Sequence, residues 1–356
     1  MVRKDIEDKI EKLRKEGATI YSFSRLEVFN ECAAAYDMTY NKKLAKSDNV
    51  YSVLGGAIHE SLEKIYNGED IDILKNFEED YGKTIGVYDF PNNARENYLK
   101  CMKHYCENFK KDDLNSLQEY PFIVEINGRY ITGIIDRITK DPNSNENTLR
   151  IIDYKTSTLY KSSDLVKKGR QLVLYAYAIE QMTGQKVTSI CWDMLKYVHV
   201  QYNKKTRKRR KLFLRNEFIY FWKEEILEEL TSQGMDFMDA LEIYMSALQS
   251  NQMPKELSDV FTVSEGYVEY EYNEETKEEL LSYLTDVINK IESENKWEYK
   301  KITANNNFNC LYLCNNRENC KALQMYFDSQ TEDVEKEEIE EIKNNSYDFS
   351  ELFGGE

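Results

Sequence analysis

Hydrophobic positions recur with a helical period through the first third of the chain. The pattern predicts helices over 3–16, from Leu26 to Leu44, over 57–67 and over about 94–111. Ser24 has Glu27 three positions on, which matches a capping box, so Ser24 is the predicted N-cap of the second helix. Gly55 and Gly56 are predicted to open the third helix. The N-terminal part of the chain is therefore predicted to be mainly helical.

The hydrophobic pattern then changes to the period of strands. Strands are predicted over 122–126, 130–138, 149–154 and 187–202, and helices over about 163–183, 216–248 and 274–295. Asn127-Gly128 separates the first two strands, and Asn-Gly between apolar runs is a strong hairpin signal. Gly184 is predicted to end the helix over 163–183. These elements predict an α/β core inside helical additions.

The composition supports a folded chain, and the charge is unevenly distributed. Hydrophobic residues make up 41% of the chain and there are only four prolines, which excludes a mostly disordered protein. The net charge of −16, taken alone, argues against a nucleic-acid partner. Residues 331–356, however, hold ten acids against two bases, so this tail carries half of the net charge. We expect a disordered tail that either solubilises the protein or binds a protein partner.

The sequence also bears on the compartment. No apolar run approaches the roughly 18–20 residues that cross a bilayer, and the charged N-terminus lacks the apolar segment of a signal peptide. We therefore expect a cytoplasmic protein that does not contact a membrane. In that reducing compartment the seven cysteines are more readily explained as buried thiols or metal ligands than as disulfides.

Two carboxylates and a lysine on the predicted strands form the strongest candidate site. Asp153 and Lys155 are two residues apart on a strand, so they project to the same face, beside Asp136 of the neighbouring strand. Convergent carboxylates suit a hard divalent cation such as Mg²⁺ or Mn²⁺, and a nearby lysine can orient water or neutralise a phosphate. Phosphodiester hydrolysis needs these groups. The alternative is an ordinary surface Asp–Lys pair, since this spacing is common.

The order of four motifs resembles the RecB-type branch of the PD-(D/E)XK nuclease superfamily. Its members include the RecB and AddB recombination nucleases and the CRISPR-associated iron–sulfur exonucleases. The motifs are Gly55-x-x-x-His59, Gly133-Ile134-Ile135-Asp136, Asp153-Tyr154-Lys155-Thr156 and Gln171-x-x-x-Tyr175, preceded by Tyr21-Ser22-Phe23-Ser24-Arg25, which is similar to the S-x-S start of the family. The resemblance extends from about residue 20 to residue 322.

The resemblance implies a fold and its division along the chain. The expected core is restriction-endonuclease-like, with a central mixed sheet flanked by helices. We expect a single nuclease body over 1–330, with an N-terminal helical part at 20–67, the catalytic core at 119–203 and a C-terminal helical part with the cysteines at 204–322. The acidic tail, 331–356, follows this body.

The resemblance also implies roles for individual residues. His59, Asp136 and Asp153 would ligate the metal, helped by the Tyr154 carbonyl. Lys155 would be the catalytic lysine, while Gln171 and Tyr175 would brace the site and touch the nucleic-acid backbone. Glu125 matches a less constant acidic position. On the residues alone, His59 is equally explained as a core histidine and Tyr175 as a helix-core tyrosine.

The cysteines near the C-terminus are a second candidate site. Cys310, Cys314 and Cys320 cluster there, and their spacing alone fits zinc, an iron–sulfur cluster or buried free thiols. The resemblance implies that these three and Cys32 ligate one [4Fe–4S] cluster, although the first gap is one residue longer than usual in the family. The other cysteines (Cys101, Cys106 and Cys191) are predicted to lie in the core.

A basic block follows the last predicted strand. It has seven bases in eight residues, Lys204, Lys205, Arg207, Lys208, Arg209, Arg210 and Lys211, which we predict to bind DNA. A solvated hairpin tip or a targeting signal would also explain it.

Together these features predict a function. The expected protein is an Mg²⁺- or Mn²⁺-dependent DNA exonuclease that hydrolyses single-stranded DNA or DNA ends in recombination, repair or phage DNA metabolism. The alternative is a non-catalytic DNA-binding or assembly subunit that keeps the nuclease fold.

Overall fold

The computed structural model describes residues 2–144, 146–204, 207–303 and 307–329. The chain folds into two compact units. The larger unit comprises Met1–Leu26 and Val50–Glu292, and the smaller comprises Glu27–Asn49 and the described part of Ser293–Glu356. The expected single body over 1–330 stays a prediction, and the predicted tail, 331–356, lies outside the described residues.

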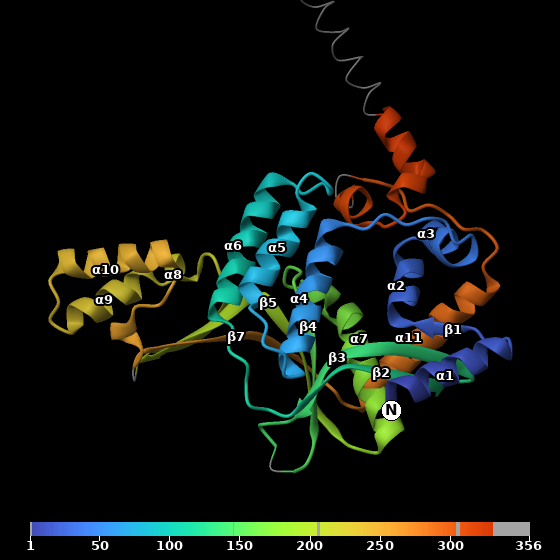
Figure 1. The fold of residues 1–356 in the computed structure, drawn as a ribbon, viewed down its shortest axis with the longest axis horizontal. Helices are drawn as coiled ribbons and strands as arrows, with labels where there is room; N and C mark the ends of the chain where they lie inside the picture. Colours follow the sequence, from blue (N-terminus) through green and yellow to red (C-terminus); the bar gives the residue numbers. More distant parts are fainter. Residues whose placement is uncertain (1, 145, 205–206, 304–306, 330–356) are drawn as a thin grey trace, which may run out of the picture. The chain divides into compact units, whose positions relative to one another are not determined.

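The larger unit is built on a mixed β-sheet (Figure 1). Its strands are β1 (Ile20–Ser22), β2 (Ser116–Ile126), β3 (Arg129–Lys140), β4 (Leu149–Lys155), β5 (Val187–Lys204), β6 (Arg207–Leu214) and β7 (Phe261–Tyr270). The order is β1-β3-β4-β5-β6, with β2 also paired to β3 and β7 also paired to β5. The β1–β3 and β4–β5 pairs are parallel, and the others are antiparallel. The predicted α/β class is confirmed.

Helices flank this sheet. Those of the larger unit are α1 (Val2–Lys15), α4 (Val50–Tyr66), α5 (Ile73–Thr84), α6 (Asn92–Asn108), α7 (Ser162–Thr183), α8 (Phe218–Phe221), α9 (Lys223–Ser232), α10 (Phe237–Ser250) and α11 (Glu274–Ser293), with a 3-10 turn at Lys255–Leu257. Helix α2 (Phe23–Glu31) continues into the smaller unit, which also holds α3 (Ala33–Tyr36), two π-helical turns (Asp37–Asn41 and Asn309–Leu313) and a 3-10 turn at Arg317–Asn319. No helix within the described ranges is long and apolar enough to span a bilayer.

The two faces of β4 belong to different environments. Ile152 and Tyr154 are buried in a core that α4, α5 and α6 supply. Because neighbouring residues of a strand point to opposite faces, Asp153 and Lys155 project away from that core. Lys155 reaches Gln171 on α7, so the polar positions of β4 face α7.

A second core lies at the far end of β5. Its buried residues include Val200 and Tyr202 of β5, Phe261 of β7, and Trp222 and Ile226 next to or within α9. Figure 1 shows α8, α9 and α10 gathered beside these strands. We call β6, β7, the part of β5 from Tyr197 to Lys204, and α8–α10 the arm.

The predicted turns are confirmed. Asn127 and Gly128 have φ of 48° and 74°, the positive values that a two-residue hairpin loop of type I′ requires. Gly184 ends α7 with φ of 69°, a left-handed conformation that glycine adopts without steric cost.

Two predicted helix starts are wrong. Helix α2 begins at Phe23, and the hydroxyl of Ser22, not that of Ser24, accepts a hydrogen bond from the Arg25 N–H at 3.2 Å. Gly55 and Gly56 lie inside α4 rather than at its start. A Cβ on Gly55 would lie 3.3 Å from Oγ1 of Thr156, so this glycine allows α4 to approach the end of β4 closely.

Two predicted helices are interrupted. The stretch from Leu26 to Leu44 breaks at Cys32, which has an extended backbone, and continues only as short turns. The stretch over 216–248 is divided into α8, α9 and α10.

Candidate metal centre and active site

The two aspartates of the candidate site lie where β3 and β4 separate. The ladder between these strands ends at the Arg137–Ile152 pair. Asp136 and Asp153 are the next residues beyond that pair, so neither sits within the ladder. The backbone N–H of Tyr154 donates a hydrogen bond to Oδ2 of Asp136 at 2.7 Å. Because the strands separate here, the backbone N–H of Tyr154 can bond to the Asp136 carboxylate instead of to a ladder partner on β3.

Asp153 and Lys155 form a buried ion pair that α7 supports. Nζ of Lys155 lies 2.5 Å from Oδ2 of Asp153, whose residue is only 1% exposed. The same Nζ donates to Oε1 of Gln171 at 3.4 Å, and Nε2 of Gln171 donates to the Tyr175 hydroxyl at 2.7 Å. The sequence placed these four residues in one site, and the structure brings them into one chain of contacts.

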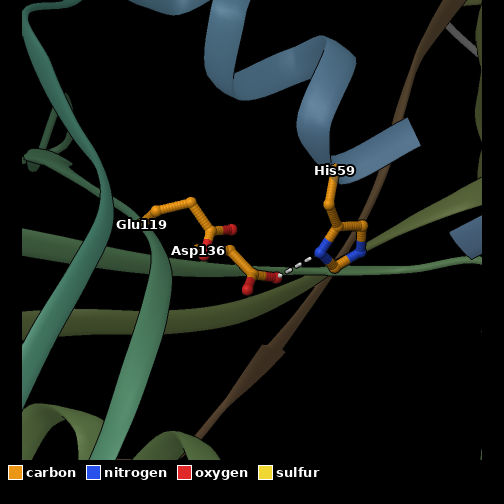
Figure 2. Close-up of side chains that lie close together, drawn as sticks. All are labelled: His59, Glu119 and Asp136. Carbon is orange, nitrogen blue, oxygen red and sulfur yellow. Dashed lines mark ion pairs between the residues drawn. The ribbon is translucent and has the colours of Figure 1, made fainter. Parts of the chain in front are cut away.

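A second set of side chains converges on Asp136. Figure 2 shows His59 of α4, Glu119 of β2 and Asp136 of β3 pointing toward one another. One ligand atom from each lies within 4.8 Å of the others. Nδ1 of His59 is 3.5 Å from Oδ2 of Asp136. One imidazole and two carboxylates are a donor set that a divalent cation can occupy, so this group is a candidate metal centre.

The electrostatics of the group favour a bound cation. Burial, with Asp136 and Glu63 adding to it, raises the pKa of Glu119 to about 7. Burial also raises the pKa of Asp153, opposed by Lys155 and reinforced by Asp136. A cation among these carboxylates would offset both the burial and their mutual repulsion.

The two basic side chains of the site, His59 and Lys155, differ in protonation state. Burial lowers the pKa of His59, although Asp136 and a hydrogen bond to the Tyr154 backbone oppose this, so the imidazole is neutral and able to ligate a metal. Burial alone would lower the pKa of Lys155, but Asp153 and Asp136 raise it above its usual value. Lys155 is therefore a fixed positive charge.

Glu119 is a candidate residue that the sequence analysis missed. The first strand was predicted to start only at residue 122, whereas β2 starts at Ser116 and includes Glu119. Glu119 has φ of 45°, an uncommon conformation for a non-glycine residue that often marks a functional site. Glu125, the acidic residue matched in its place, is exposed and pairs across the ladder with Tyr130. It does not belong to the candidate metal group.

This difference can be tested with a matched pair of variants. Glu119→Gln is expected to weaken Mn²⁺ binding by at least about tenfold, because it removes one charge from the group. Glu125→Gln removes the same charge from the same strand and is expected to leave the affinity unchanged. Calorimetric titration of both variants with Mn²⁺ checks this; equal affinities would contradict a ligand role for Glu119.

The basic block lies on β5 and β6. Nζ of Lys204 is 2.6 Å from Oε1 of Glu229, and the guanidinium of Arg209 is paired with Glu225. Lys208, Arg210 and Lys211 are exposed. Lys205 lies outside the described residues, and the side chain of Arg207 is not described. Two bases of the block are thus neutralised by acids of α9, and three face solvent.

The four candidate cluster cysteines all belong to the smaller unit. Cys32 Sγ accepts a hydrogen bond from the Lys300 N–H at 3.4 Å. Burial raises the pKa of Cys314, and the nearby Cys320 and Cys32 raise it further. In the part of the chain that the structure describes, no three of these sulfurs lie within 4.8 Å of one another. The predicted core positions of Cys101, Cys106 and Cys191 are confirmed.

Comparisons with known proteins identify one family whose model covers most of the chain. The family described as the PD-(D/E)XK nuclease superfamily matches residues 20–321. Among curated proteins, no match was found. A crystal structure of a "Putative exonuclease" from Eubacterium rectale is 13% identical, covers 69% of this chain and 84% of its own, and has a TM-score of 0.29. The structure of SSO0001 is 16% identical, covers 63% and 86%, and has a TM-score of 0.20. With TM-scores this low, neither structure assigns a property to this chain.

Proposed function

The chain belongs to the PD-(D/E)XK nuclease superfamily, and we propose on this premise that it is a RecB-like, AddB-like DNA exonuclease that depends on Mg²⁺ or Mn²⁺. It hydrolyses phosphodiester bonds of single-stranded DNA or of DNA ends, in recombination, repair or phage DNA metabolism. The observation that carries the proposal is the meeting of a histidine–carboxylate group (His59, Glu119 and Asp136) with the buried Asp153–Lys155 pair in the larger unit.

Each residue of the site has a part in the proposed reaction. His59, Glu119 and Asp136 would hold the metal, together with Asp153 and the Tyr154 carbonyl. When bound, the cation polarises the phosphate and makes an attacking water more acidic. Lys155 stabilises the negative charge that develops on the phosphate in the transition state. Gln171 and Tyr175 keep the Lys155 ammonium in position through their hydrogen bonds.

The reaction class can be tested with two forms of one substrate. A linear and a covalently closed circular single strand of the same sequence are incubated with the protein and Mg²⁺. We expect short products from the linear form alone, because an exonuclease needs an end. Cleavage of both forms would indicate an endonuclease, and binding without cleavage of either would favour the non-catalytic subunit.

We also propose that Cys32, Cys310, Cys314 and Cys320 ligate a [4Fe–4S] cluster, as in the CRISPR-associated iron–sulfur exonucleases that this sequence resembles. All four are thiols of one compact unit, and the nearby Cys314, Cys320 and Cys32 all add to the burial that raises the pKa of Cys310. A tetrahedral zinc site, with Zn–S bonds of about 2.3 Å, would need sulfurs about 4 Å apart. A [4Fe–4S] cluster would contact each thiolate through a different iron, so the same four cysteines serve either group and metal analysis distinguishes them.

Removal of one cysteine is expected to remove the iron and to destabilise the protein. A cross-link that closes a loop of 100 residues or more stabilises a fold by about 4–5 kcal/mol, and Cys314→Ala should lose a comparable amount. Iron and sulfide analysis of anaerobically purified protein, together with its unfolding transition, checks this. Cys101→Ala serves as the control that should retain iron. A colourless wild-type protein without iron would contradict the cluster, and bound zinc would preserve only the ligands.

Further features of the proposal concern location and partners. The seven free cysteines are consistent with action in the cytoplasm, where thiols stay reduced. The acidic segment 331–356, which lies outside the described residues, ends in an apolar–acidic stretch from Tyr347 to Phe353. We propose that this stretch binds a protein partner.

The exposed bases of β6 are proposed to contact DNA phosphates. Changing Lys208, Arg210 and Lys211 to alanine should reduce the slope of log affinity against log salt concentration by about 2 for single-stranded DNA, since each phosphate contact adds about 0.7. Fluorescence anisotropy in EDTA over a range of NaCl concentrations measures this slope. The matched control changes Lys75, Lys100 and Lys103, three exposed lysines of α5 and α6, and should leave it unaltered. Equal slopes in both triple variants would refute the contact.

A further inference from the structure

We propose that the arm carries a stacking platform for single-stranded DNA, formed by the exposed rings of Tyr220 and Phe221 beside the basic side chains of β6. The inference deepens the function proposed above and rests on it, since it assigns single strands as the preferred substrate. The platform shares no residue with the candidate metal group, since its residues belong to β6 and α8 whereas the metal group comes from β2, β3 and α4.

The pairing of β6 with β5 fixes which of its side chains share a face. Lys211 and Phe213 lie opposite Val200 and Val198, which are both buried in the arm's core. Paired residues of neighbouring strands project to the same face, so Lys211 and Phe213 point to the side on which α8 and α9 pack. Lys211 is nevertheless exposed. One exposed cation therefore stands next to the aromatic cluster of the arm.

Two aromatic rings extend this row to solvent. The ring of Phe213 stacks on that of Phe221, with centroids 5.2 Å apart and an angle of 21° between the planes. Phe221 in turn meets Tyr220 edge to face, at 5.7 Å. Phe221 is 53% exposed and Tyr220 64%, whereas Trp222 beside them is 1% exposed. Of these three consecutive aromatic residues, Trp222 is therefore buried in the core of the arm, whereas Tyr220 and Phe221 are open to solvent.

The chemistry of this surface fits single-stranded nucleic acid. Unpaired bases stack on aromatic rings while their phosphates meet a nearby cation, which on this face is Lys211. Lys208 and Arg210 alternate with Lys211 along β6 and point to the opposite face of the strand. A duplex keeps its bases stacked within itself, so it can use the cations but not the rings. The platform is therefore expected to discriminate single strands from duplexes.

A different exposed apolar surface on the arm lacks this chemistry. Phe237, Met238 and Met245 of α10 are each more than half exposed. The charged residues of that helix, Asp239 and Glu242, are both acidic and would repel phosphates. This surface provides a control with similar apolar exposure and the opposite charge.

The test measures the binding of labelled single-stranded and duplex oligonucleotides by the full chain in EDTA, where no cleavage occurs. Tyr220→Ala is expected to weaken single-strand binding by about tenfold and to leave duplex binding unchanged. Tyr220→Trp should retain single-strand affinity, because indole also stacks. Phe221→Ala should resemble Tyr220→Ala; if it fails to fold because it loses its contact with Phe213, the two Tyr220 variants decide.

Three outcomes would overturn the platform. These are unchanged single-strand affinity in Tyr220→Ala, an equal loss for the duplex, and an equal loss in the α10 control Met238→Ala. Cleavage by Tyr220→Ala at saturating DNA separates the two proposals. A protein that cleaves DNA but binds normally without Tyr220 would refute the platform and leave the nuclease intact. A protein that needs Tyr220 for binding but never cleaves with Mg²⁺ or Mn²⁺ would refute the nuclease and leave the platform intact.

Discussion

Replacing Asp153 by asparagine is expected to reduce DNA cleavage in Mg²⁺ by about 1000-fold or more. The change keeps the shape of the side chain but removes the charge that would hold the cation and that pairs with Lys155 at 2.5 Å. Both losses act on the step in which charge develops on the phosphate. The rate of cleavage of end-labelled single-stranded DNA under single-turnover conditions measures the effect.

The control for this variant is Asp113→Asn, the same chemical change at an exposed position outside the site. It should cleave DNA at the wild-type rate. Asp153→Asn should also bind single-stranded DNA in EDTA as the wild type does, because the proposed binding surface is on the arm. Full cleavage by Asp153→Asn would place the reaction elsewhere in the protein.

Replacing Lys155 by alanine is expected to reduce cleavage by about 100- to 1000-fold while Mn²⁺ binding persists. Lys155 is held by Asp153 and by Gln171, and its raised pKa keeps it positively charged. It therefore contributes a cation to the transition state without being a metal ligand. Removing it leaves the ligands in place, so the loss should fall on the reaction rate rather than on the affinity for the metal.

Calorimetric titration with Mn²⁺ distinguishes the two variants. Lys155→Ala should bind Mn²⁺ at least as tightly as the wild type, because a positive charge near the ligands is gone, whereas Asp153→Asn should bind it more weakly. Lys168→Ala, on the same helix as Gln171, provides a lysine control that should affect neither property. Loss of Mn²⁺ binding in Lys155→Ala would show that Lys155 organises the ligands instead.

The parts of the fold that could be predicted depend on local signals. The hairpin at Asn127-Gly128 and the end of α7 at Gly184 follow from the conformational freedom of single residues. β4 could be predicted because its apolar run is continuous. β6 could not be predicted, since its first five residues are all basic and resemble a solvated loop. It forms a strand because its long partner β5 offers a free edge, which no local pattern reveals.

The site shows the same limit. Asp136, Asp153 and Lys155 could be found because strand alternation places residues two apart on one face. Glu119 could not, because its position depends on a positive φ within β2 and on the pairing of β2 with β3. The family resemblance pointed instead to Glu125, which pairs with Tyr130. A single backbone irregularity thus exchanges one acidic residue for another.

The net charge of −16 is a poor guide to the partner of this protein. Acids are needed at the metal centre, where their raised pKa values reflect burial and close approach. Acids of α9 also neutralise Lys204 and Arg209, so the net charge of the basic block overstates its attraction for phosphates. The exposed trio Lys208, Arg210 and Lys211 is the better measure.

The central claim is that the histidine–carboxylate group and the Asp153–Lys155 pair make one metal-dependent nuclease site. Its most direct test is the incubation of wild-type protein with end-labelled linear single-stranded DNA, in Mg²⁺, in Mn²⁺ and in EDTA. The account predicts release of the label with either metal and an intact strand in EDTA. An intact strand in all three, or cleavage that persists in EDTA, would contradict it.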